Sequence, residues 1–170
     1  MIVVAALVPI LSGCIGPFAS SSSPELPCNA EVVNFYGNIE TLGSGTRFTE
    51  ELGKAARDSD SVTLIEVTRA AGWTDGWERM VDVQPAMDPE DLSRAAQANV
   101  APGCWKGIPA KQDSSTEVPW GYYLFFANNR PVQKIIWTGD KKPLRLNDRL
   151  ALAPPSVLIR DPKGRLVPAP

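Results

Sequence analysis

The chain contains no histidine among its 170 residues. This absence excludes Ser-His-Asp and Cys-His catalysis, and it removes the commonest protein ligand of zinc and copper. There are only three cysteines, none of them in a Cys-x-x-Cys pair, and the chain lacks both a P-loop and a dinucleotide-binding glycine motif. We therefore expect a protein that is not an enzyme and that carries neither a metal nor an organic cofactor.

Paired carboxylates are the remaining route to acid–base catalysis. Glu50/Glu51 and Glu90/Asp91 are the clearest pairs, but both lie where a helix is expected to begin. Acidic side chains in a first turn stabilise the helix dipole, which explains these pairs without chemistry. A carboxylate-dependent hydrolase is thus the least favoured function for this sequence.

Long hydrophobic runs are also absent. The longest, Ile2–Leu11, has ten residues and includes Pro9, whereas a membrane-spanning helix needs about 20. A run of this length is typical of a signal peptide. No Lys or Arg precedes it, so either translation starts upstream or the signal is atypical.

The run ends in Leu11-Ser12-Gly13-Cys14, which resembles the lipobox of bacterial lipoproteins. The resemblance implies cleavage before Cys14 and a diacylglyceryl group on its thiol. Two or three acyl chains, palmitate among them, would anchor the protein durably, since each buried methylene adds about 0.8 kcal/mol. We therefore expect an extracytoplasmic protein attached to a bacterial membrane through Cys14.

The residues after Cys14 are rich in Ser and Pro and have too little apolar content to form a core. We predict a signal peptide over residues 1–13, a lipidated tether over residues 14–30 and one globular domain over residues 31–170. With Cys14 acylated, Cys28 and Cys104 remain as an even pair. An exported protein permits a disulfide between them, the alternative being two buried thiols.

The folded part reads as an α+β domain with a mainly antiparallel sheet and about two helices. Phe48, Leu52 and Ala55/Ala56 share one face of a helix capped by Thr46 or Thr49, and a second helix begins at Asp88-Pro89. Apolar and β-branched runs predict the strands. These are "SVTLIEVTRA", "WERMVDVQP", a hairpin around "ANNRP", "SVLIR" and "RLVP".

The order of these segments also resembles a group of small uncharacterised bacterial lipoproteins over about residues 60–165. The likeness rests on Trp77-Glu78-Arg79-Met80 entering a strand, a Pro-led helix and an aromatic hairpin with a polar tip. Glu78 stands where that group carries Asp. The group has no established activity, so the resemblance bears on fold and location.

Two charged residues lie within apolar strand patterns. Alternation places Trp77, Arg79, Val81 and Val83 on one face, and Glu66 interrupts "VTLIEVT". Because an unpaired buried charge is costly, we expect Glu66 and Arg79 to form a structural ion pair or to lie at an edge open to water. The alternative is that the two form the floor of a ligand groove with Trp77 beside it. The five tryptophans likewise suit either a core or a recognition surface.

Charge is unevenly spread: residues 14–120 carry a net −8 and residues 121–170 a net +6. The two halves either pair their charges across the fold or present a basic surface to anionic lipid. The candidates for that surface are Lys141, Lys142, Arg145 and Arg149, in a predicted exposed loop.

The sequence thus favours a non-enzymatic lipoprotein that binds an envelope protein or has a structural role there, and that does not bind nucleic acid. The alternative is a binder of small ligands or lipid headgroups that uses the aromatic and basic side chains.

Overall fold

The computed structural model describes residues 27–29, 31–113, 115, 117–139 and 142–170. Cys14, the predicted signal peptide and most of the tether lie outside these residues, as does Lys141. In the described part, no helix has both the length and the apolar content needed to cross a membrane.

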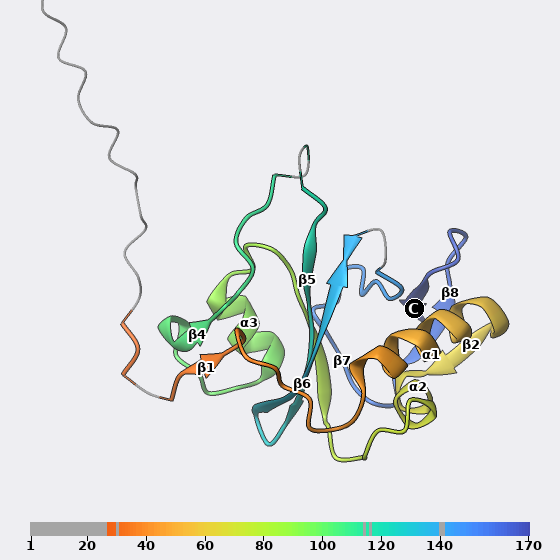
Figure 1. Cartoon of the computed structure of the whole chain (residues 1–170), viewed down its shortest axis with the longest axis horizontal. Helices are drawn as coiled ribbons and strands as arrows, with labels where there is room; N and C mark the ends of the chain where they lie inside the picture. Colours follow the sequence, from red (N-terminus) through yellow and green to blue (C-terminus); the bar gives the residue numbers. More distant parts are fainter. Residues whose placement is uncertain (1–26, 30, 114, 116, 140–141) are drawn as a thin grey trace, which may run out of the picture.

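A four-stranded antiparallel sheet forms the centre of the domain (Figure 1). Its strand order is β6-β5-β3-β7, with β3 at Arg79–Val83, β5 at Trp120–Ala127, β6 at Arg130–Thr138 and β7 at Ala151–Leu152. Residues 121–126 of β5 are all buried, because both faces of the sheet are covered. The predicted hairpin is confirmed: Asn128 and Asn129, with φ of 49° and 61°, form the tight turn between β5 and β6.

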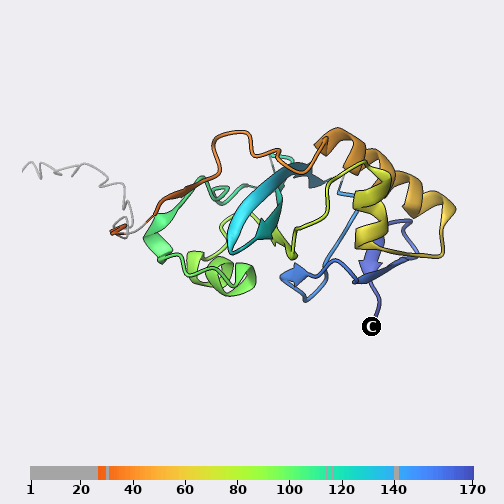
Figure 2. The same cartoon turned by 90° about the horizontal axis from the view of Figure 1, so that it is seen from below.

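One face of the sheet packs against α1 (Gly45–Asp58) and α2 (Leu64–Ala70), as Figure 2 shows from below. A second, three-stranded antiparallel sheet closes this side with β2 (Ser61–Thr63), β8 (Val157–Arg160) and β9 (Leu166–Pro168). Phe48, Leu52 and Ala56 are the buried stripe of α1, as predicted. Its N-cap, however, is Ser44 rather than Thr46 or Thr49.

The segment "SVTLIEVTRA" is only partly a strand, which corrects the prediction. After three residues of β2 the chain enters α2 at Leu64, because Thr63 and Glu66 form a capping box. The Thr63 hydroxyl accepts from the Glu66 N–H, and the Glu66 carboxylate accepts from the Thr63 N–H. A local capping signal is thus enough to override β-branched content.

The other face of the sheet is covered by α3 (Pro89–Ala96), the short helix η1 (Pro102–Cys104) and a parallel pair of strands, β1 (Val33–Asn34) and β4 (Trp105–Lys106). The Asp88 side chain accepts from the Glu90 N–H and Pro89 begins α3, which confirms the predicted start.

The described residues therefore form an α+β domain with mainly antiparallel sheets, as expected. They contain three α-helices rather than two, because α2 replaces part of a predicted strand.

Candidate functional site

Glu66 and Arg79 do not form the predicted ion pair. Glu66 is held in the α2 capping box, which lowers its pKa through hydrogen bonds from Thr63. Arg79 instead donates to the carbonyl of Ala96 at the end of α3 and, at 3.3 Å, to Asn129 Oδ1. The guanidinium thus neutralises a helix C-terminus and joins α3 to the hairpin tip.

Trp77 lies on the opposite side of the sheet from Val81 and Val83, so the predicted shared face is wrong. It precedes β3 rather than belonging to it, and its ring is buried against Phe125 at a centroid distance of 5.0 Å. Trp73, Trp105 and Trp137 are buried as well. Among the tryptophans, Trp120 alone has a substantially exposed side chain, at 37%.

The described cations of the basic segment after the hairpin, Lys142, Arg145 and Arg149, do not form one exposed patch. The Lys142 side chain is buried, which corrects the expectation that its charge faces solvent, and it reaches back to the central strand β3. Arg149 is exposed and donates to the carbonyl of Ala169 at 2.9 Å, while Arg145 is exposed at the rim of a small recess.

Lys142 forms an ion pair with Asp82, with 2.6 Å between Nζ and Oδ2, and the two side chains are only 9% and 2% exposed. The ammonium also lies 3.7 Å from the centroid of the Trp137 ring, a cation–π contact. Gln84 Nε2 donates to the same carboxylate oxygen at 2.8 Å. Within the described part of the chain, Asp82 Oδ1 and Trp137 Nε1 have no hydrogen-bond partner.

Burial raises the pKa of Asp82 above that of an ordinary carboxyl, against the opposing effects of Lys142, Trp137 and Gln84. Burial likewise lowers the pKa of Lys142, although Asp82 opposes this. Both shifts favour the neutral forms, so desolvation outweighs attraction within the pair.

A recess of about 160 Å³ opens beside this pair, rimmed by Gln84, Arg145, Leu146 and Asn147. The two charged residues deepest in the recess, Asp82 and Lys142, already form an ion pair with each other, so neither charge is free to bind a ligand. In the described residues, no group of three or more His, Cys, Asp or Glu side chains is arranged to hold a metal ion. We interpret the Asp82–Lys142 pair as the attachment of the 142–150 loop to the sheet.

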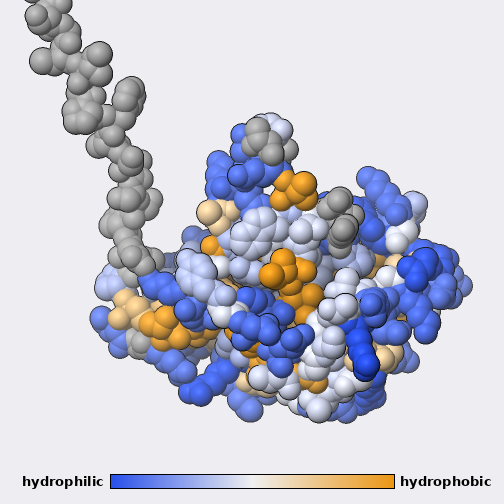
Figure 3. Space-filling view, in the orientation of Figure 1, coloured by the Kyte–Doolittle hydropathy of each residue, from blue (hydrophilic) through white to orange (hydrophobic). Residues whose placement is uncertain are grey.

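The most unusual surface lies over the half of the β5–β6 hairpin that is farther from its turn. Three large apolar residues in or beside it are exposed, and we call them the aromatic face: Tyr36 at 80%, Ile136 at 62% and Trp120 at 37%. Figure 3 shows apolar atoms exposed in the middle of this side of the molecule, where Figure 1 places β6.

Tyr122 joins the members of the aromatic face. Its ring lies 5.5 Å from that of Trp120, and its backbone pairs with Ile136 across the β5–β6 ladder. Burial, followed by the nearby Tyr36, raises the pKa of the Tyr122 hydroxyl. The Lys134 ammonium lies 5.1 Å from the Tyr122 centroid and donates to the carbonyl of Gly37 at 2.6 Å.

A groove of about 440 Å³ runs along the edge of β6 beside the aromatic face. Ile135 and Ile136 lie at the strand, and residues 36–38 form one wall. Thr46 and Thr49, from the first turns of α1, form the other wall. Two charged residues, Lys134 and Glu40, also line the groove, but Lys134 donates to the Gly37 carbonyl and Glu40 accepts from the Gly45 N–H. The groove is open, unlike a deep site with converging polar groups.

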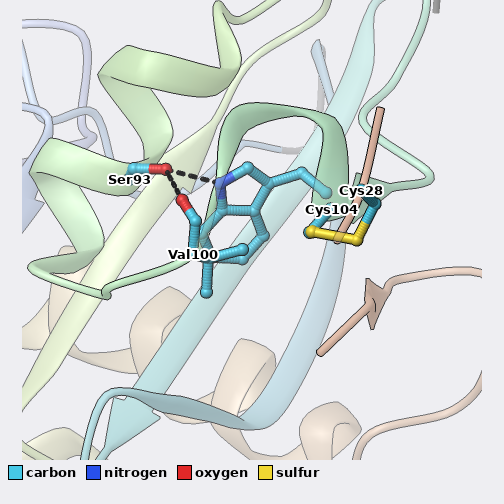
Figure 4. Close-up of a disulfide and its surroundings, with 5 residues drawn as sticks. Cys28, Ser93, Val100 and Cys104 are labelled. Carbon is cyan, nitrogen blue, oxygen red and sulfur yellow. Dashed lines mark hydrogen bonds between the residues drawn. A yellow bond between two sulfur atoms is a disulfide. The ribbon is translucent and has the colours of Figure 1, made fainter. Parts of the chain in front are cut away.

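The predicted disulfide is present: Cys28 and Cys104 are bonded, with 4.8 Å between their Cα atoms. Figure 4 shows the bond between Cys28 and Cys104 with Ser93 and Val100 nearby. The residue after Cys104 is Trp105, whose indole N–H donates to the Ser93 hydroxyl at 2.6 Å. Ser93 Oγ lies 2.9 Å from the carbonyl oxygen of Val100. The bond therefore ties the end of the predicted tether to the layer that contains α3.

Charges of the two halves pair across the fold. Besides Asp82–Lys142, Arg130 lies 2.9 Å from Glu31 and Arg160 lies 3.3 Å from Asp60. These pairs account for part of the charge asymmetry without any external anion.

The sequence did not predict the aromatic face. Ile136 looks like a core residue of an aromatic strand, and Tyr36 lies in a segment without clear periodicity. Only the tertiary structure shows that no described element covers them. Comparison with known proteins finds no matching family model, no similar curated protein and no similar solved structure.

Proposed function

We propose that this protein is a lipid-anchored, extracytoplasmic binding protein whose aromatic face contacts a polypeptide partner in the bacterial envelope. The observation that carries the binding role is the exposure of Trp120, Ile136 and Tyr36 around one place on the hairpin. Trp120 contacts the Tyr122 ring, Ile136 pairs with Tyr122 across the ladder, and Tyr36 lines the same groove as Ile136. Contiguous apolar surface of this kind is typical of protein–protein contacts, and aromatic residues contribute strongly to such interfaces.

The proposed location rests on Leu11-Ser12-Gly13-Cys14 after a short apolar run. The Cys28–Cys104 disulfide agrees with it, because disulfides persist in oxidising compartments outside the cytoplasm. The anchor would hold the domain near the membrane, where a partner is met at raised effective concentration.

A binder of small ligands or lipid headgroups is less well supported. It requires Lys142 and its neighbours to converge on a ligand, whereas Lys142 is engaged by Asp82 and Arg149 by Ala169. In the described lining of the groove beside β6, the one cation is Lys134, which already donates to the carbonyls of Phe35 and Gly37, whereas an anionic headgroup attracts several cations.

The anchor is tested by metabolic labelling with palmitate and by membrane fractionation. Cys14→Ser should abolish both the label and membrane recovery. The matched control, Cys28→Ser with Cys104→Ser, removes the other two cysteines and should remain labelled. A labelled Cys14→Ser chain would refute the lipid anchor.

The binding role is tested by purifying the anchored chain, with its partners, from solubilised membranes. Tyr36→Ser combined with Ile136→Ser should lose a partner that the wild type retains. Val157→Ser, at a residue 44% exposed on β8, should keep it. Identical partners for all three chains would exclude the aromatic face as the binding surface.

A further inference from the structure

Strand β6 is an edge of the central sheet, and only its first half is covered. Residues 39–41 pair with it in antiparallel fashion around an isolated bridge between Glu40 and Gln133. The Lys134 N–H donates to the carbonyl of Ile39 at 2.7 Å, and the Thr41 N–H donates to the carbonyl of Val132 at 3.2 Å. The chain itself therefore shows that this edge accepts an added strand.

The second half of the edge has no such pairing in the described part of the chain. Backbone groups alternate sides along a strand, so Ile136 and Thr138 point outward as Lys134 does. Gly139 agrees with this alternation, since its N–H donates to Pro119 on the β5 side. Among the residues that the structure describes, none forms a hydrogen bond with the outward N–H or C=O groups of Ile136 and Thr138.

The side chains along β6 differ between its two halves. Arg130, Pro131 and Lys134 are of the residue types that protect edges against pairing, and all lie at or before the covered part. Residues 135–138, "IIWT", carry no charge and no proline, and the groove beside the aromatic face is lined by Ile135 and Ile136. This half of the edge carries no protecting residue, and the two charged residues that line the groove, Lys134 and Glu40, are already bonded within the chain. The free edge therefore suits an uncharged, extended occupant.

We propose that the partner adds a short extended segment to the free half of β6. The segment pairs with the backbone of Ile136 in the groove between residues 36–38 and α1, and with the backbone of Thr138 just beyond the groove. The occupant is a segment of another polypeptide with apolar residues at alternate positions, because residues on one face of a strand recur with period two. The apolar positions would contact Ile136 and Tyr36. The proposal rests on the proposed function, since it specifies how the aromatic face is used.

The first experiment locates the occupant. The photo-crosslinking residue p-benzoylphenylalanine is placed at Thr46, on the α1 wall of the groove, in the full-length chain in the cells that produce it. We expect a cross-link to one envelope polypeptide, mapped by mass spectrometry to a short segment with alternating apolar residues. No adduct, or an adduct with a second copy of this chain, would overturn the proposal.

The second experiment tests the backbone contacts, with a synthetic peptide that spans the cross-linked segment as the probe. Thr138→Pro removes the outward N–H, whereas the matched control Thr138→Val keeps it and changes only the side chain. We expect Thr138→Val to bind within about twofold of wild type and Thr138→Pro to bind at least about tenfold more weakly, as the loss of one buried hydrogen bond implies.

Amide hydrogen exchange of the wild-type chain provides a readout that does not depend on folding of the proline variant. The peptide should protect the Ile136 and Thr138 amides from exchange. If both variants bind equally, or if these amides stay unprotected, strand addition is wrong. The proposed function would still stand if binding depended on Tyr36 and Ile136.

Discussion

The Asp82–Lys142 pair lies where two charges are costly to hold. Burial raises the pKa of Asp82 and lowers that of Lys142, so burial disfavours the charged form of each side chain. The opposite charge of the partner stabilises that charged form. Removing one partner would leave the other charge buried and alone, which is far less favourable than removing both.

We therefore expect Lys142→Met to lower the free energy of unfolding by about 3–5 kcal/mol at neutral pH. Without Lys142, burial would raise the pKa of Asp82 further. The unfolded carboxyl ionises near pH 4, and the folded one only at higher pH. The loss in the free energy of unfolding caused by Lys142→Met should therefore become smaller as the pH falls from 7.5 to 4.5, because the folded Asp82 takes up a proton.

Urea denaturation at pH 7.5 and 4.5 measures this difference. Lys163→Met, at an exposed lysine in the turn between β8 and β9, is the control and should change stability by less than about 0.5 kcal/mol. A Lys142→Met deficit of the same size at both pH values would show that the loss comes from packing rather than from charge.

Gly121 is a second residue whose identity is fixed by its neighbours. A Cβ at this position would collide with the carbonyl oxygen of Val83 and with the Trp137 ring, which lies across β5. Both obstacles belong to the sheet and cannot move independently. We expect Gly121→Ala to destabilise the domain by about 1–3 kcal/mol in thermal or urea unfolding.

Gly37→Ala is the matched control, because nothing lies within 4 Å of a Cβ added there. Equal stability of the two variants would mean that β5 and Trp137 adjust to the added methyl group.

Lys142 and Asp82 mark a limit of sequence reasoning. Lys142 reads as exposed because Pro143 and polar neighbours predict a loop, and nothing local points to Asp82, 60 residues earlier. Asp82 lies between Val81 and Val83, so alternation places it on the solvent face of a half-buried strand. In the structure both faces are covered, and the charge needs a partner.

Elements with strong local signals were predictable. Asp88-Pro89 begins α3, and Asn128-Asn129 turns the hairpin, each because a few adjacent residues determine the backbone. Helix α2 was missed although its signal was present, since Thr63 followed by Glu66 three residues later is a capping-box pattern that the sequence alone displays. The β-branched residues of this segment favour a strand, but the capping box begins a helix there.

The capping box can be tested in isolation. Thr63→Ala removes the hydroxyl that accepts from the Glu66 N–H and donates to its carboxylate at 2.6 Å. We expect a loss of about 1 kcal/mol in the free energy of unfolding, typical of an N-cap. Thr63→Ser keeps the hydroxyl and should retain most of the stability; a loss as large as that of alanine would assign the effect to the methyl group instead.

The aromatic face depends on the packing of the whole domain, and neither a single residue nor a single element predicts it. Tyr36 comes from the segment after β1, and Trp120 and Ile136 come from the hairpin. Their exposure depends on where the layer with α3 ends and where α1 begins. A sequence pattern records which residues are apolar, but only the packing of layers decides which of them are left uncovered.

The disulfide acts on the entire domain, because it closes a loop of 76 residues that includes the first three helices and the central strand β3. Besides the bond, this segment is held by the fully buried Phe35 and by β1, which pairs with β4 over two residues only. In the chain-entropy description a loop of this size stabilises the folded state by about 4–5 kcal/mol, and measured losses on removing a disulfide are about 2–5 kcal/mol.

We expect the double variant Cys28→Ser with Cys104→Ser to lose an amount of unfolding free energy in that range, measured by urea denaturation of chains that begin at Ile15. Reducing the wild type should lower its stability to that of the double variant, while the same reductant should leave the double variant unchanged. If reduction has no effect on the wild type, the β1–β4 pairing and the packing of Phe35 and Trp105 hold this segment by themselves, and the bond contributes nothing to the fold.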